Sequence, residues 1–165
     1  MASTITASTL KVTISENISL NGRQQGGSQT FSIASINEIY KRIVTCPSGV
    51  DTTVARFGVS TDVTDASLDI QDTKYIRVTN LDDTNSVNVN LQIDVTESGS
   101  GASAVNETAT ILLAAGQSLL MGTGHDSIAV YDADGSVQTT LHDLESILID
   151  PSSNAVDIEV FIASV

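Results

Sequence analysis

The stretch from Lys74 to Val95, KYIRVTNLDDTNSVNVNLQIDV, decides the fold of this chain. From Val87 to Val95, apolar residues alternate without a break with amide and acidic residues. Successive side chains of a strand point to opposite faces, so this pattern predicts a strand with one apolar and one polar face. On a helix the same residues would spread around the whole circumference. The first half alternates similarly, with Ile76 and Val78 on its apolar side.

Between the two halves, Asp82 to Asn85 has the composition of a turn, because Asn and Asp form local side-chain hydrogen bonds and tolerate positive φ. We therefore predict a β-hairpin in a half-buried antiparallel sheet, with Lys74 to Leu81 paired to Ser86 to Val95. Other strands must then cover its apolar face.

The rest of the chain shows further short apolar or alternating runs separated by turn residues. These runs are Leu10 to Leu20 with an interruption at Glu16-Asn17, Thr30 to Ile33, Glu38 to Val44, Thr53 to Ser60, Thr110 to Leu113, Ser118 to Met121, Ser127 to Tyr131, Ile147 to Ile149 and Val156 to Ile162. We expect an all-β fold, an antiparallel β-sandwich of jelly-roll type with roughly nine or ten short strands. Turns are expected at Asn21-Gly22 and Gly116-Gln117, and a last hairpin around Pro151 to Asn154.

Two segments stay open between strand and helix. Ser35 to Glu38 has the spacing of a capping box, and Ile36, Ile39 and Ile43 would share a helix face. The β-branched and aromatic residues of this segment favour strands instead. Leu141 to Leu148 could form the one short helix of the chain.

The length of 165 residues predicts one domain, a single β-sandwich over residues 10–165 preceded by a flexible N-terminal arm, residues 1–9. Only 4% of the residues are aromatic and none is Trp, so the core should consist mainly of Ile, Val and Leu. Cys46 is the only cysteine, which excludes an intrachain disulfide and favours a buried small apolar residue. The start lacks the pattern of a signal peptide, and we expect synthesis in a host cytoplasm.

Charge excludes two classes of partner. Seven basic residues stand against twenty acidic ones, a net charge of −13. Phosphate binding depends on clustered Lys and Arg, so we expect no nucleic-acid partner. The same acidic surface and the lack of a long apolar run predict no membrane partner.

Metal binding has weak support in the sequence. Asp132 to Ser136 resembles the start of a calcium loop, but the twelfth position is Asp143 rather than Glu, and Gly135 falls too early. A turn explains this segment better. An ion held by the acidic link Asp62 to Asp72 or by Asp82-Asp83 remains an open alternative, and no cofactor is expected.

No catalytic motif is present. His125 and His142 each precede a carboxylate, the pairing that a general base needs. Adjacent strand residues point to opposite faces, however, which makes such neighbours poor partners. A dyad of Cys46 with a remote histidine has no local support. We therefore expect a protein that is not an enzyme.

Four segments together resemble small structural proteins of tailed bacteriophages, particularly virion proteins of marine phages. They are Ser32 to Ile39 with Ile43 to Thr45, Lys74 to Asn80, Leu112 to Ser118 and Asp157 to Ala163. The resemblance implies a β-sandwich on the capsid exterior that docks on the major capsid protein or other virion proteins, often as a homotrimer.

The expected function is that of a capsid decoration (cement) protein that stabilises the shell. A neck, tail or fibre component of the same virion is one alternative, and a carbohydrate-binding β-sandwich using Asn80 to Asn90 is another. Two aromatic residues on otherwise polar strand faces would mark a partner surface. The candidate contact residues are Met1, Ala2, Ser3, Thr4, Ile5, Thr6, Tyr75 and Phe161.

Overall fold

The computed structural model describes residues 5–58, 68–96, 104–122, 129–130 and 142–165, and all regular structure in them is β. The strands are β1 (Ser8–Ser15), β2 (Ser19–Leu20), β3 (Arg23–Gln24), β4 (Ser28–Ile36), β5 (Glu38–Cys46), β6 (Thr52–Gly58), β7 (Leu68–Asp69), β8 (Thr73–Asn80), β9 (Val87–Thr96), β10 (Ala104–Leu113), β11 (Ser118–Gly122), β12 (Ala129–Val130), β13 (His142–Pro151) and β14 (Val156–Ser164). The predicted all-β class is confirmed, with more strands than expected. The helical alternatives are wrong, because β4 and β5 occupy the first segment and β13 the second.

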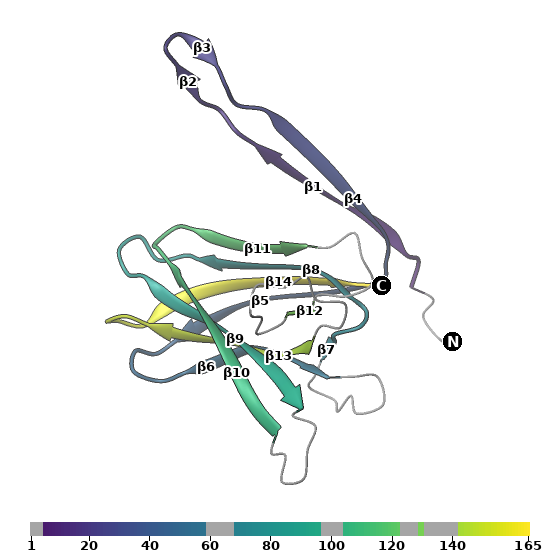
Figure 1. Ribbon diagram of the computed structural model, residues 1–165, viewed down its shortest axis with the longest axis vertical. Helices are drawn as coiled ribbons and strands as arrows, with labels where there is room; N and C mark the ends of the chain where they lie inside the picture. Colours follow the sequence, from purple (N-terminus) through teal and green to yellow (C-terminus); the bar gives the residue numbers. More distant parts are fainter. Residues whose placement is uncertain (1–4, 59–67, 97–103, 123–128, 131–141) are drawn as a thin grey trace.

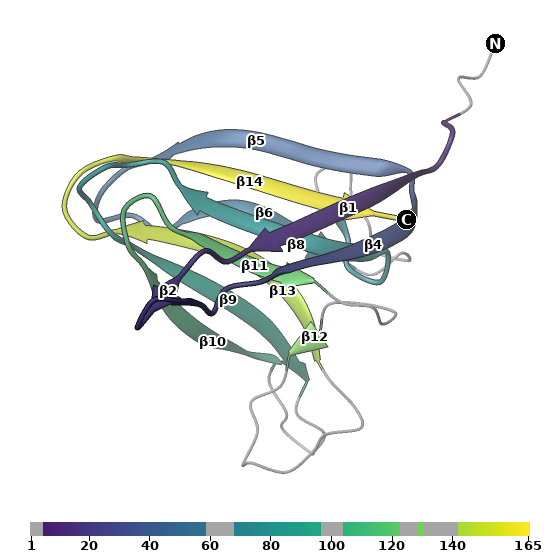
Figure 2. The ribbon, with the colours of Figure 1, turned by 90° about the horizontal axis from the view of Figure 1, so that it is seen from above.

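Two sheets face each other and form a sandwich (Figures 1 and 2). One has the strand order β10-β9-β13-β6-β7, with β12 also paired to β13, and the other has the order β11-β8-β14-β5. Neighbouring strands are antiparallel except for the short parallel pair β6 and β7. We call the second sheet the β5 sheet, after the strand at its edge.

Six connections between consecutive strands lead from one sheet to the other. They run from β5 to β6, from β7 to β8, from β8 to β9, from β10 to β11, from β11 to β12 and from β13 to β14. Without the two-residue strands β7 and β12, the sheets have the orders β10-β9-β13-β6 and β11-β8-β14-β5, which is the strand order of an eight-stranded jelly roll. The jelly-roll form of the predicted sandwich is thereby confirmed.

The predicted hairpin of Lys74 to Val95 is wrong, although both of its strands exist. β8 pairs with β11 and β14, whereas β9 pairs with β10 and β13 in the opposite sheet. The hairpin around Pro151 to Asn154 is wrong for the same reason, since β13 and β14 also lie in different sheets. Alternation specifies which face of a strand is apolar. Two such strands can pair side by side in one sheet, or they can lie in different sheets with their apolar faces packed against each other across the core. In this chain they meet across the core.

Asn80 holds one of these corners in place. Its side chain is fully buried, and its Nδ2 donates hydrogen bonds to the carbonyl oxygens of Asn85 at 2.8 Å and Leu113 at 3.4 Å. Its Oδ1 accepts from the backbone N–H of Asp82 at 3.0 Å. One side chain thus links the β8–β9 corner to the end of β10.

The core between the sheets is aliphatic, as the composition predicts. The largest fully buried side chains are those of Ile70, Ile76, Leu144, Ile147, Ile149, Ile158, Ile162, Val78, Val87, Val89, Val156 and Val160. Cys46 is also fully buried, and this burial raises the pKa of its thiol. Its predicted role as a small apolar core residue is confirmed.

A long hairpin projects away from the sandwich (Figure 1). β1 and β4 pair along their length and β2 pairs with β3 at the tip; we call residues 8–36 the projecting hairpin. Asn21 and Gly22 have φ of 52° and 74°, as a two-residue type I′ turn requires, so the turn predicted there is confirmed. The expected break of the first strand near Glu16-Asn17 is confirmed too.

The projecting hairpin continues directly from the edge of the β5 sheet. A single residue, Asn37, separates β4 from β5, and its backbone N–H donates to the carbonyl of Ser164 at 3.0 Å. Ser35 has φ of 64°, a conformation that non-glycine residues seldom adopt. This joint turns the chain out of the sheet and sets the direction of the hairpin.

Candidate interaction surface

The outer face of the β5 sheet carries several large side chains that lie outside the core between the sheets. Along β14, Ile158, Val160 and Ile162 point into the core, so Asp157, Glu159 and Phe161 point outward. The strand register places Lys41 and Arg77 on either side of Phe161. The result is an outward face that mixes aromatic, aliphatic and charged side chains.

A compact charge network occupies the middle of this face. Glu159 accepts from Arg77 and forms an ion pair with Lys41, whose Nζ lies 3.2 Å from Oε2. The Arg77 guanidinium also lies over the Phe161 ring, 5.7 Å from its centroid. Burial acts to raise the pKa of Glu159, but the hydrogen bond and charge of Lys41, with those of Arg77, outweigh it and lower the pKa below its ordinary value.

The base of the projecting hairpin covers one end of the outer face. Phe31 of β4 packs against Tyr75 with ring centroids 6.5 Å apart, and Tyr75 meets Phe161 edge to face at 6.0 Å. Gly122 leaves the room for this contact, since a Cβ there would lie 3.3 Å from the Tyr75 ring and 3.6 Å from the Phe31 ring. Ile36 and Ala163 complete this second, smaller core.

Beyond this contact, both the outer face of the β5 sheet and the projecting hairpin have further apolar residues that are exposed. On the outer face, Ile39 and Ile43 of β5 are 59% and 60% exposed, and Leu120 of β11 is exposed as well. On the projecting hairpin, Ile18 and Leu20 are 54% and 60% exposed. The two sets are not in contact, because the hairpin rises away from the sheet after its base (Figure 1).

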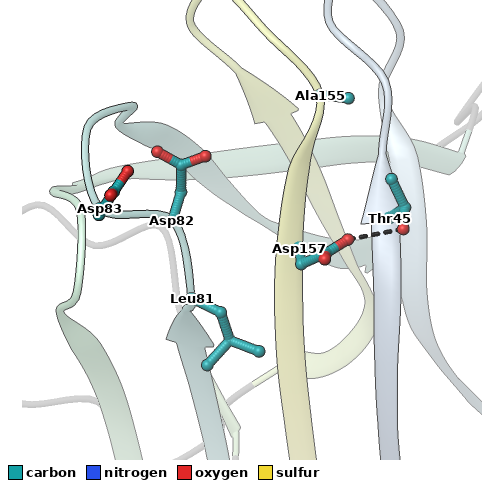
Figure 3. Close-up of a pocket in the computed structure, with 6 residues that line it drawn as sticks. All are labelled: Thr45, Leu81, Asp82, Asp83, Ala155 and Asp157. Atoms are coloured by element: carbon teal, nitrogen blue, oxygen red, sulfur yellow. Dashed lines mark hydrogen bonds between the residues drawn. The ribbon is translucent and has the colours of Figure 1, made fainter.

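An open groove lies at the far end of the same face, where the sheets are joined (Figure 3). It is lined by Thr45, Leu81, Asp82, Asp83, Ala155 and Asp157. Thr45 donates to the carboxylate of Asp157 at 2.6 Å. Hydrogen bonds from the backbone N–H groups of Asn85 and Thr84 lower the pKa of Asp82, which remains ionised. The groove is acidic, with the exposed Leu81 as its apolar wall.

Asp82 therefore caps a turn, which accounts for its carboxylate without an ion. Within the described residues, no group of three His, Cys, Asp or Glu side chains is placed to hold a metal. The calcium-like segment Asp132 to Ser136, most of the acidic link 62–72 and His125 lie outside these residues, as does the side chain of His142. Cys46 lies in the core.

The structure brings two of the candidate contact residues together. Tyr75 and Phe161 lie side by side on the outer face, and Tyr75 is buried beneath the chain's own projecting hairpin. Ile5 and Thr6 are exposed, and Met1 to Thr4 lie outside the described residues. Whether these residues contact a partner stays a prediction.

The sequence favoured strands for Glu38 to Val44 and grouped Ile39 with Ile43 only in the helical alternative, so their exposure on one strand face was not predicted. A signal for them exists. Glu38 to Val44 has apolar residues at Ile39 and Ile43 and also at Tyr40 and Val44, so both faces of a strand there carry apolar groups. One face of β5 packs in the core between the sheets. The other face leaves Ile39 and Ile43 exposed, so these apolar side chains could be buried only by a further segment or a partner.

Comparison with known proteins gave no match to any family model, curated protein or solved structure. Among the described residues, no helix is long and apolar enough to cross a membrane. The surface itself therefore supplies the evidence for function.

Proposed function

We propose that this chain is a non-enzymatic structural protein of a tailed-phage virion, a capsid decoration protein that binds the outside of the head and stabilises the shell. The observation that carries the proposal is the set of exposed apolar residues on the projecting hairpin and on the outer face of the β5 sheet. Exposed apolar patches of this kind mark surfaces that bind other proteins. The groove at the far end of this face is open and acidic.

The fold and the charge are compatible with this role. Jelly rolls are common among viral capsid domains, although one fold serves many functions. A net charge of −13 suits a position outside a DNA-filled shell, because it discourages contact with nucleic acid. A protein that binds only the assembled shell stabilises it by mass action.

The test is to locate the protein in purified particles of the encoding phage by electron microscopy. The proposal expects many copies on the head surface, near local three-fold positions, bound to the major capsid protein. A few copies at a single vertex would support the alternative of a neck, tail or fibre component. Absence from the particles would overturn both.

Residues 1–9 are a second contact candidate. A polar N-terminal segment can order on docking by adding a strand to a neighbour's sheet edge. Removing residues 1–9 should lower the number of copies per capsid. Unchanged occupancy would show that docking does not need this segment.

The carbohydrate-binding alternative has less support. Asn80 is buried and bonded to backbone carbonyls, and Asn90 accepts a hydrogen bond from Thr110 at 2.8 Å. The residues that line the groove include no aromatic ring on which a sugar could stack. A glycan array, probed with and without chelator, separates this function from the structural one.

A further inference from the structure

We propose that the projecting hairpin of one copy packs on the outer face of the β5 sheet of a second copy, with its tip in the acidic groove. The interface joins two copies of this chain and does not depend on where in a virion, or in any other assembly, the protein resides. Three independent features of the structure support it.

The first feature is continuity of an interface that already exists. At its base the hairpin buries Phe31 against Tyr75 and thereby covers one end of the outer face. The uncovered residues Ile39 and Ile43 extend the same face, and Ile14 extends the apolar side of the hairpin, on which Leu10 and Val12 already pack. Each chain thus exposes both an apolar sheet face and an apolar hairpin side. Within one chain these two surfaces meet only at the base of the hairpin.

The second feature is reach. At about 3.3 Å per residue, the strand path from Val12 to Asn21 is roughly 30 Å long, and that from Ile39 to Thr45 roughly 20 Å. A hairpin that lies along a neighbour's outer face is therefore long enough to bring its tip to the groove. Within one chain it diverges from that face (Figure 1).

The third feature is charge. The charged side chains of residues 1–37 are those of Lys11, Arg23 and Glu16, which gives this part a formal charge of +1. Because the whole chain has a net charge of −13, residues 38–165 have a net charge of −14. At the tip, Arg23 is the register partner of Leu20, which places both side chains on one side of the hairpin. That side matches the groove, where Leu81 lies beside Asp82 and Asp83.

Cysteine crosslinking tests the placement directly. Leu20→Cys is introduced in one copy and Leu81→Cys in a second copy carrying a tag of different size, and the two are mixed and oxidised. We expect a disulfide-linked pair of unlike size. The buried native Cys46 stays silent. Ser19→Cys, at the same height on the opposite side of the hairpin, is the matched control and should link at least tenfold more slowly.

The crosslinking experiment also separates the two possible paths of the hairpin. In a chain carrying both Leu20→Cys and Leu81→Cys, the proposal expects the link between chains. A disulfide formed only within single chains would show that the hairpin folds down on its own sheet. That result, or equal linking by Ser19→Cys, would overturn the proposal.

Oligomeric state gives a second, independent readout. The full chain should have a mass of at least two copies by light scattering at micromolar concentration. Ile39→Ser with Ile43→Ser, and Ile18→Ser with Leu20→Ser, should each lower that mass towards one copy. Leu112→Ser, which alters an exposed apolar residue of the other sheet, is the control and should leave the mass unchanged. A wild-type chain that stays monomeric, or a control that dissociates as fully, would overturn the proposal.

Discussion

The projecting hairpin and the sandwich are built from the same kind of strand but differ in what covers their apolar side. In β9, Val87, Val89 and Leu91 are buried beneath the opposite sheet. In β1, Leu10 and Val12 alternate with polar residues in the same way, yet they are only partly buried. The difference teaches that alternation identifies the side of a strand that needs a cover and does not show that the same chain supplies one.

The two regions should therefore differ in stability as well. A two-stranded ribbon is marginal in water, whereas the sandwich has a continuous aliphatic core. Local unfolding begins in regions with few buried apolar contacts. The hairpin is expected to open far more often than the sheets, and the following changes test that contrast.

The largest effect is expected from Ile162→Ala in the core, where the side chain is fully buried. Loss of its packing and the remaining cavity should lower the free energy of unfolding by about 2–5 kcal/mol. Ile14→Ala, on the half-covered hairpin, should change it by less than about 0.5 kcal/mol. Urea titrations at low protein concentration measure both, and equal losses would remove the contrast.

Asn80→Ala tests a corner of the sandwich. The carbonyl groups of Asn85 and Leu113 and the N–H of Asp82 would lose a buried partner, which should cost about 1–3 kcal/mol. Asn154→Ala removes only a long, exposed contact to Asn85 at 3.5 Å and serves as the control. A loss from Asn80→Ala no larger than that of the control would show that water replaces these bonds.

Gly26→Ala should disrupt the projecting hairpin alone. A Cβ at this position would overlap the backbone oxygen of Glu16, so the two chains of the hairpin must separate locally. Overpacking of this kind costs about 1–3 kcal/mol, enough to open a marginal ribbon. Amide exchange should quicken throughout β1 to β4 and stay unchanged in β8 and β14. Gly27→Ala meets no atom within 4 Å and is the matched control.

The smallest effect concerns pH and the charge network of the outer face. The pKa of Glu159 is lowered on folding, so its contribution to stability is complete above the ordinary value near 4.5 and is lost as the pH falls below it. Its partner Lys41 is 56% exposed, which limits the effect to less than about 1 kcal/mol. Between pH 6 and pH 3, Glu159→Gln should lose less stability than the wild type. Equal losses of unfolding free energy in the wild type and in Glu159→Gln between these pH values would exclude this contribution of Glu159.

Much of the fold was predictable from local patterns, because strand alternation and turn residues act over a few neighbours. The strands of Lys74 to Asn80 and Val87 to Val95 follow from alternation, and the type I′ turn follows from Asn21-Gly22. Pairing partners are a different matter. Asp82 to Asn85 favours a change of direction, but the choice between a hairpin and a corner depends on the distant strands β11 and β14 that pair with β8.

The interaction surface was less predictable. Tyr75 and Phe161 were each expected on an otherwise polar strand face, and the structure places them side by side. The cover over Tyr75 comes from Phe31, which no local pattern connects to it. The exposed side of β5 was obscured because its isoleucines fit a helical spacing as well as a strand. Long-range placement, rather than residue type, determines this surface.

The joint at Ser35 to Asn37 has a consequence for how such a protein can change over time. Within the described residues, it is the only covalent path between the hairpin and the two sheets. Insertions or deletions near the tip therefore leave the folding of the jelly roll untouched while altering the span that the hairpin bridges. The length of the hairpin can therefore change during evolution without a change in the jelly roll, so the same jelly roll can contact neighbours at different distances.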